Sequence, residues 1–284
     1  MQSITNKIYS DNLFNELATS EYEHTVFIEA SHISSVVSDP KNNQILQLSV
    51  FSAPGINFLM LSYDELKEIA PLTECLKPKY KERKVVISSQ QVSLVPESLL
   101  NVVETEAYYG LNQKIMPQSQ VLYCKMHVQQ TAALFNVRNE LMKLIRFGMP
   151  MVDVYHGSLL FIKAVESQGF ENAANKLHIQ VHASYVEILN LDQHIKFYNT
   201  FTFESDTEIV YYLLAAAEQL QISHACDVVL YGNAAHLNEL YLLLQKYVKS
   251  VQYGIKPKMY TYPLSFKQFG EHQFFNESAA LLCV

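Results

Sequence analysis

Two short segments of the chain carry polar side chains that could bind a phosphate group or a metal ion. Glu29-Ala30-Ser31-His32 and His182-Ala183-Ser184-Tyr185 each join two runs rich in apolar residues, and they begin 153 residues apart (182 − 29). Carboxylate oxygens can hold the water ligands of Mg²⁺, so Glu29 is a candidate for such a role. The hydroxyls of Ser31 and Ser184 could donate to a phosphate. The structural alternative is that Glu29 is an ordinary strand-end carboxylate and that both serines cap tight turns.

Other arrangements that could support chemistry are weaker. Gly232 follows a buried apolar run, where it either marks the edge of a nucleotide cleft or forms a simple strand-to-helix turn. His178 and His182 have the i, i+4 spacing of a helical zinc pair, but their surroundings predict a strand. Four residues of strand span about 13 Å, too far for one ion with Zn–N bonds of about 2 Å. The sequence contains no readable Ser-His-Asp grouping, Cys-His grouping or Walker-type loop, so we predict no catalytic residues and no metal site.

The composition restricts the class of protein. The chain has 284 residues, of which 49% are hydrophobic and 17% charged, as is typical of a globular protein large enough for two lobes. The formal net charge of −7 argues against a general nucleic-acid binder, which usually carries a basic patch. The sequence has no run of about 18 apolar residues, so we expect no membrane-spanning helix. Its first residues lack the order of a signal peptide, and we expect a cytoplasmic location.

The order of expected strands and helices is the same in the two halves of the chain. Each half has three strands in a meander, then a helix, then a buried strand. Ser62 and Ser205 each precede a glutamate three residues later, which is the spacing of a capping box at the start of a helix. The buried strand Val85-Val86-Ile87 is matched to Val228-Val229-Leu230. The expected strands are 25–29, 33–37, 45–51 and 84–88, and then 176–181, 185–190, 195–203 and 226–231. The sequence therefore predicts an internal duplication.

The chain is expected to divide into an extension and two lobes. Residues 1–21, rich in polar and acidic residues, are expected to form a flexible N-terminal extension. Residues 22–167 are expected to form the first lobe and residues 168–284 the second. Residues 89–128 have no counterpart in the second half, and we interpret them as an insertion in the first lobe. Its tyrosine pair, Tyr108-Tyr109, either contacts a partner protein or packs the insertion onto its own lobe.

A β-β-β-α-β-α unit that occurs twice resembles the actin-like (ribonuclease H-like) ATPase fold. This fold is shared by actin, sugar kinases, Hsp70, FtsA-type division proteins and PilM-type pilus proteins. Two further segments are similar to an uncharacterised bacterial family of unknown function that is described as having this fold. They are Leu159–Lys163, before the second meander, and Phe197 with Asn199-Thr200-Phe201, before the second capped helix. The resemblance covers about residues 22–284 and implies an α/β protein with two lobes around a cleft.

The resemblance also shows where the chain departs from active members of the fold. In these members the first turn of each meander reads Asp-x-Gly followed by a hydroxyl residue, and the glycine lets backbone N–H groups approach the triphosphate. Here the first turn keeps an acid, Glu29, but has Ser31 in place of the glycine. The second turn, at His182, has neither acid nor glycine. Active members also carry a Gly-Gly turn that admits adenosine, and Gly232-Asn233 keeps one of the two glycines.

The resemblance therefore implies a vestigial nucleotide cleft formed by Glu29, Ser31, Ser184 and Gly232, with no bound cofactor. It implies a non-catalytic scaffold or adaptor protein. The alternative is a nucleotide-binding ATPase or phosphotransferase that uses Glu29 in a non-standard site. In FtsA-type and PilM-type proteins the extra subdomain of the first lobe mediates assembly, so the resemblance also implies a protein partner. The identity of this partner and the oligomeric state stay open.

Overall fold

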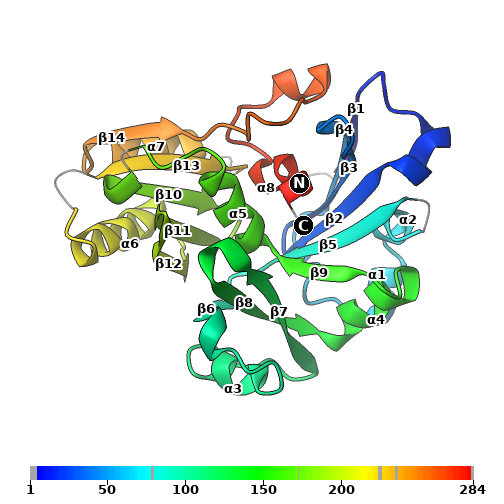
Figure 1. Ribbon diagram of the computed structural model, residues 1–284, viewed down its shortest axis with the longest axis horizontal. Coiled ribbons are helices and arrows are strands. Elements are labelled where there is room, and N and C mark those ends of the chain that lie inside the picture. Colours follow the sequence, from blue (N-terminus) through cyan, green and yellow to red (C-terminus); the bar gives the residue numbers. More distant parts are fainter. Residues whose placement is uncertain (1–4, 78–79, 172, 223–225, 234–235, 283–284) are drawn as a thin grey trace. The chain divides into compact units, whose positions relative to one another are not determined.

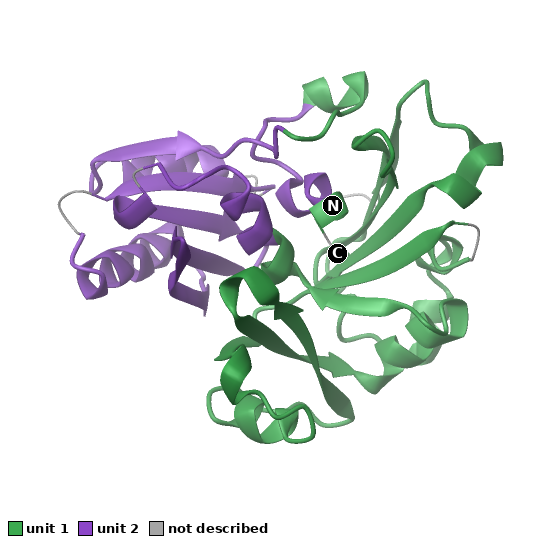
Figure 2. Cartoon of the chain, viewed as in Figure 1, with its two compact units in different colours: residues 1–160, 259–268, 280–284 green, residues 161–258, 269–279 purple. Residues whose placement is uncertain are grey.

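The structure, a computed structural model, describes residues 5–77, 80–171, 173–222, 226–233 and 236–282. The chain divides into two compact units, which Figure 2 distinguishes by colour. Unit 1 comprises residues 1–160, 259–268 and 280–284, and unit 2 comprises residues 161–258 and 269–279.

These bounds differ from the lobes expected at 22–167 and 168–284. Residues 259–268 belong to unit 1, where Ile45 N–H donates to the Thr261 carbonyl at 2.9 Å. Phe161 belongs to unit 2, where its ring packs against Tyr231 with the ring centroids 5.7 Å apart. Both contacts join residues far apart in the sequence, so no local pattern indicates them.

Unit 1 is built on a six-stranded sheet whose strand order is β1-β4-β3-β2-β5-β9 (Figure 1). β2 runs antiparallel to β3 and parallel to β5, and β5 runs parallel to β9. Val85, Val86 and Ile87 are buried at consecutive positions of β5, which means that both faces of this central strand are covered. In the order of the sheet, the strands are β1 (Thr5–Ser10), β4 (Gln44–Ser52), β3 (His32–Asp39), β2 (Glu23–Glu29), β5 (Glu82–Ser88) and β9 (Asp153–His156).

Helices gather beside β5 and β9 in unit 1 (Figure 1). They are α1 (Tyr63–Lys67), α2 (Ala70–Cys75) and α4 (Asn139–Gly148). α4 is amphipathic, and its buried side chains are Leu141, Met142, Leu144 and Ile145. The short helices η1 (Glu16–Glu21), η5 (Leu264–Gln268) and η6 (Ala280–Leu282) complete the unit, together with the subdomain that follows β5.

The expectation of a flexible extension over residues 1–21 is wrong for Thr5–Ser10. These residues form the edge strand β1, which pairs antiparallel with β4 from Thr5↔Ser52 to Ser10↔Gln47. The hydroxyls of Thr5 and Ser52 lie 2.8 Å apart. A polar edge strand buries little apolar surface, so its composition resembles that of a loop, and the composition misled the prediction.

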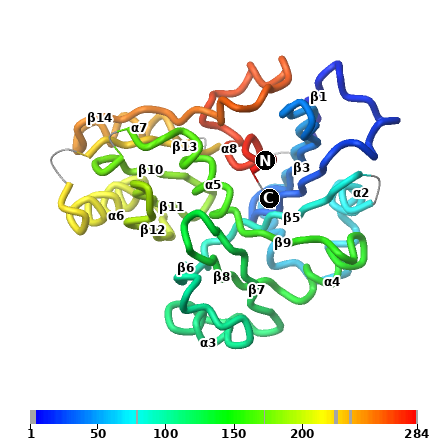
Figure 3. The backbone as a smooth tube through the Cα atoms, viewed as in Figure 1, coloured from blue at the N-terminus to red at the C-terminus, as the bar shows by residue number. Residues whose placement is uncertain are grey.

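The subdomain after β5 is a three-stranded sheet of order β6-β8-β7 (Figure 3). Its elements are β6 (Val92–Pro96), η2 (Glu97–Leu99), α3 (Thr105–Gly110), β7 (Ser119–Met126), η3 (His127–Gln129) and β8 (Thr131–Arg138). The insertion expected at 89–128 therefore ends too early, because β8 is the central strand of this sheet. β8 is rich in apolar residues and reads like any core strand, so its sequence gave no sign of which sheet it joins.

The tyrosine pair of this subdomain belongs largely to its core. Tyr109 is fully buried with Val95, Ala132 and Leu134, and its hydroxyl donates to the Gln91 carbonyl at 3.3 Å. The burial raises the pKa of Tyr109 to about 12. The expectation that a partner contacts Tyr109 is therefore wrong, and the ring packs the subdomain, as the alternative held.

Unit 2 is built on a five-stranded sheet of order β12-β11-β10-β13-β14. One face packs under α6 and α7 and carries Ile179, Ile188 and Leu230. The opposite face carries His178, Glu187 and other polar side chains, because successive strand residues alternate between faces. The elements are α5 (Gly157–Glu166), which begins in unit 1, and η4 (Ala173–Asn175), β10 (Lys176–Val181), β11 (Tyr185–Asp192), β12 (His194–Thr202), α6 (Asp206–Gln219), β13 (Asp227–Gly232), α7 (Leu237–Leu244), β14 (Ser250–Tyr253) and α8 (Phe275–Ser278).

The two sheets have matching strand orders. β2, β3, β4, β5 and β9 pair with one another in the same order and directions as β10, β11, β12, β13 and β14, and β4 pairs in addition with β1. Val26 of β2 pairs with Val85 of β5. The residue equivalent to Val26 in unit 2 is Ile179, which lies 153 positions later (179 − 26) and pairs with Leu230 of β13. Val85 therefore corresponds to Leu230 and not to Val228 as the sequence suggested. A shift of two residues keeps every side chain on its face, so the apolar pattern cannot detect it.

The two helix starts that resemble each other in sequence differ in structure. The Ser62 hydroxyl accepts from Glu65 N–H, and the Glu65 carboxylate accepts from Ser62 N–H, so the predicted capping box of α1 is confirmed. Ser205 is the N-cap residue of α6 but makes no side-chain capping bond. The Glu208 carboxylate instead accepts from Glu204 N–H at 2.8 Å. The prediction of a Ser205 cap is therefore wrong.

Candidate functional site

In unit 1, the turn between β2 and β3 holds a carboxylate beside an imidazole. Glu29 is the last residue of β2, and its Oε2 lies 3.8 Å from His32 Nδ1. His32 Nδ1 also lies 3.1 Å from the Ser31 hydroxyl. The Ala30 carbonyl accepts from Phe58 N–H at 3.1 Å, so the segment after β4 supports the turn. The hydroxyl of Ser31 is thus engaged within the turn.

In unit 2, the equivalent turn is fixed to the sheet by a buried carboxylate. His182 Nε2 lies 2.7 Å from Glu187 Oε1, and the Tyr198 hydroxyl donates to Glu187 Oε2 at 2.6 Å. The His182 ring stacks on Tyr185 with the centroids 4.1 Å apart. Glu187 is only 1% exposed. The position that carries the acid in active members is therefore taken by an imidazole bound to a carboxylate of β11. Ser184 is exposed in this turn, and its carbonyl accepts from Phe203 N–H.

Sequence reasoning missed Glu187 and Tyr198. When the strand registers of the two units are matched, the position equivalent to Glu187 in unit 1 is Ser34, and the position equivalent to Tyr198 is Leu48. The signal that could have revealed Glu187 is its setting, because a charged residue between Val186 and Ile188 in a buried strand needs a partner.

Gly232, at the end of β13, is required by the packing of the backbone. Its φ is +131°, and a Cβ there would lie 2.3 Å from the Val181 carbonyl oxygen. Gly232 N–H donates to the His272 carbonyl at 3.0 Å, and the Asn233 side-chain oxygen accepts from Phe274 N–H at 2.8 Å. The segment 269–279 of the same unit thus engages both residues, and the strand-to-helix turn accounts for the glycine without a ligand.

The four residues of the predicted vestigial cleft lie in two units. Glu29 and Ser31 lie in unit 1, and Ser184 and Gly232 lie in unit 2. In each unit they lie at the carboxyl ends of adjacent parallel strands, since Glu29 pairs with Ser88 of β5 and Val181 pairs with Gly232. Ligands of open α/β sheets commonly bind at this end of the strands.

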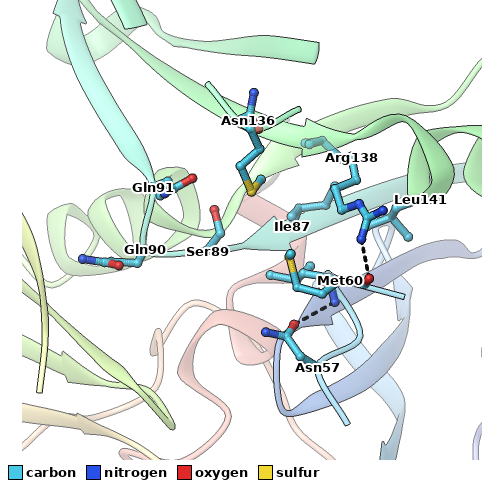
Figure 4. Close-up of a pocket in the computed structure, with 12 residues that line it drawn as sticks. Asn57, Met60, Ile87, Ser89, Gln90, Gln91, Asn136, Arg138 and Leu141 are labelled. Carbon is cyan, nitrogen blue, oxygen red and sulfur yellow. Dashed lines mark hydrogen bonds between the residues drawn. The ribbon is translucent and has the colours of Figure 1, made fainter. Parts of the chain in front are cut away.

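A pocket of about 110 Å³, lined by both apolar and polar residues, opens beside the carboxyl end of β5 in unit 1 (Figure 4). Asn136 is 3% exposed, and neither its side-chain oxygen nor its nitrogen has a hydrogen-bond partner. The Gln91 side-chain oxygen also lacks one. The Arg138 guanidinium crosses the pocket wall and donates to the Met60 carbonyl. An unsatisfied buried amide costs about 1–3 kcal/mol, so this pocket is suited to a small polar group or to water.

The remaining histidines of interest have separate partners. The His178 Nδ1 lies 3.0 Å from the Tyr231 hydroxyl, and burial lowers the pKa of His178 to about 3. His156 is buried, with Nδ1 2.9 Å from the Ser158 hydroxyl, which is itself fully buried and out of reach of a substrate. Among the residues that the structure describes, no group of three or more His, Cys, Asp and Glu side chains could hold a metal ion.

Solved structures similar to this chain establish the fold. A Bacteroides thetaiotaomicron protein with an actin-like ATPase fold and unknown function is 17% identical, with a TM-score of 0.80, over 96% of this chain and 100% of that chain. PilM in the PilM–PilN type IV pilus biogenesis complex is 15% identical, with a TM-score of 0.58, over 92% of this chain and 98% of that chain. The chain therefore has the actin-like ATPase fold, as the sequence predicted.

A helix that spans a bilayer must be long and apolar. In the described part of the chain, no helix is long and apolar enough to do so.

Among curated proteins, none matches this chain. One family matches residues 11–251, which is most of the sequence. The chain thus belongs to the family of proteins of unknown function DUF3822.

Proposed function

We propose that the protein is a non-catalytic scaffold or adaptor with an actin-like ATPase fold, which acts by binding a protein partner. The observation that carries this proposal is the turn at His182, where the acid and the glycine of active members are both missing. Glu187 holds the imidazole there at 2.7 Å. Hard cations such as Mg²⁺ prefer oxygen ligands, and a phosphate turn needs free backbone N–H groups.

The second support is the use of Gly232 by the chain itself. The Gly232 N–H donates to the His272 carbonyl. In active members the equivalent turn admits adenosine, whereas here its backbone N–H is bound by the chain itself. In unit 1, Ser31 replaces the glycine that would let the backbone approach a phosphate. These features together favour loss of nucleotide turnover over a non-standard ATPase site.

Two further observations support a protein-binding role. The PilM structure among the similar ones is a complex with PilN, and unit 1 carries the additional subdomain of β6, β7 and β8. The matching strand orders of units 1 and 2 support the inference that one ancestral unit was duplicated and then diverged at the two turns.

Titration calorimetry of the full chain with Mg-ATP tests the loss of nucleotide binding. We expect no saturable heat and no release of phosphate. A dissociation constant in the low micromolar range would overturn the proposal. Hydrolysis that Glu29→Gln abolishes, and that Glu74→Gln at an exposed position of α2 preserves, would instead establish the ATPase or phosphotransferase alternative.

A further inference from the structure

The end of α4 in unit 1 presents exposed apolar side chains. Phe147 is 79% exposed, and Met151, just beyond the helix, is 95% exposed. Phe147 lines two hollows of about 560 and 540 Å³, one toward Tyr63 of α1 and the other toward Leu76 at the end of α2. We call these two hollows, with Phe147 between them, the Phe147 surface. Exposed apolar side chains gathered in this way commonly mark a site of interaction.

The floor of the Phe147 surface is closely packed. Leu76 and Leu144 are buried beneath it. Gly148 lies so near α2 that a Cβ there would be 2.7 Å from Leu76 Cβ. The Gly148 carbonyl accepts from Arg83 Nη1 at 3.3 Å, which ties the end of α4 to β5. The hollow is therefore already formed in the free chain, which lowers the entropic cost of binding.

The charged residues that line the Phe147 surface are all cationic. Its lining includes four cations and no carboxylate: Lys67, Lys77, Lys143 and Arg146. Within the described residues, none of the four forms an ion pair. Lys143 Nζ lies 4.2 Å and Lys67 Nζ 5.4 Å from the centre of the Tyr63 ring. Glu140 is nearby, and its carboxylate accepts from Tyr63 N–H at 3.0 Å. A cationic surface on a chain of net charge −7 is complementary to an acidic partner.

We propose that the Phe147 surface docks an acidic segment of a partner protein and seats an apolar side chain of that segment beside Phe147. The aspartates and glutamates of the segment pair with the four cations, while its apolar anchor covers the exposed ring. The inference rests on the proposed function, because it names the chemistry of the partner. The two remain separable, since calorimetry with Mg-ATP tests nucleotide binding and does not involve this surface.

Two synthetic peptides provide the probe. Both carry leucine and phenylalanine at the same positions, and the remaining positions are Asp and Glu in one and Lys and Arg in the other. Fluorescence anisotropy with the full chain should show binding of the acidic peptide only, weakened by added salt. Phe147→Ser and Lys143→Glu should each weaken binding by at least about tenfold. Tyr211→Ser, which removes an exposed aromatic residue of α6 in unit 2, should leave binding unchanged.

Several results would overturn the inference. The acidic peptide could fail to bind, both peptides could bind equally, or Phe147→Ser could have no effect. Circular dichroism checks that each variant is folded, which we expect because Phe147 and Lys143 are exposed. If sedimentation shows a dimer that Phe147→Ser dissociates, the occupant is a second copy of the chain. If vesicles of anionic phospholipid bind and the acidic peptide does not, the occupant is a membrane.

Discussion

Replacing Glu187 with leucine should destabilise the protein strongly, because Glu187 holds the second turn to its sheet. The substitution keeps much of the volume but removes the acceptor of two hydrogen bonds, at 2.7 Å to His182 and 2.6 Å to Tyr198. Breaking a buried, hydrogen-bonded pair by removing one partner costs about 3–5 kcal/mol. Tyr198→Phe removes only one of the two bonds and should cost about 1.5–3 kcal/mol, the usual range for a bond to a charged group.

Urea denaturation followed by circular dichroism measures both losses. Glu218→Leu, at an exposed position of α6, is the matched control and should change the unfolding free energy little. A double-mutant cycle with His182→Ala isolates the coupling between His182 and Glu187. A loss of unfolding free energy below about 1 kcal/mol for Glu187→Leu, or a coupling energy near zero, would refute the reasoning that the Glu187 carboxylate now stabilises the turn.

Three further predictions test the fold. Ser62→Ala should cost about 1 kcal/mol in urea denaturation, and Ser205→Ala clearly less, because only the first loses a capping bond. Burial lowers the pKa of His24 to about 4 and that of His178 to about 3, from 6.5. The unfolded chain then binds more protons than the folded one, so the unfolding free energy should fall as pH drops from 6.5 toward 4. His24→Gln should flatten this dependence, and an unchanged slope would contradict the assignment. Gly232→Ala should lower the melting temperature, since the strained backbone alone costs about 1–3 kcal/mol.

The sequence was informative where local rules decide the structure. Alternating apolar residues revealed both meanders, and the spacing of Ser62 and Glu65 revealed a capping box that the structure contains. The same spacing at Ser205 was misleading, because a cap also depends on the rotamer and on competing acceptors such as Glu208. Sequence spacing thus predicts that a helix begins but not which bond satisfies its first N–H groups.

The candidate site was harder to predict than the fold. The resemblance pointed to the turns at Glu29 and His182, yet it could not show what holds them. Glu187 meets His182 only because the hairpin of β10 and β11 folds back, and Tyr198 reaches it from the next strand. Side-chain partners across strands depend on register, which the period of two leaves undetermined. The Phe147 surface depends on packing among three helices, and no sequence motif indicates it.

The hydrogen bond from Ile45 to Thr261 has a consequence for synthesis on the ribosome. It joins residues 216 positions apart (261 − 45) within one unit, and residues 280–282 also belong to that unit. Because translation proceeds from the N-terminus, unit 1 cannot complete its contacts until residues 259–268 and 280–282 have emerged. The strands of its six-stranded sheet all lie within residues 5–156 and can pair earlier, but the segment 259–268 can join them only after residues 161–258 of unit 2 have been made. Chaperone binding to nascent chains should accordingly persist until residues 259–268 and 280–282 have emerged.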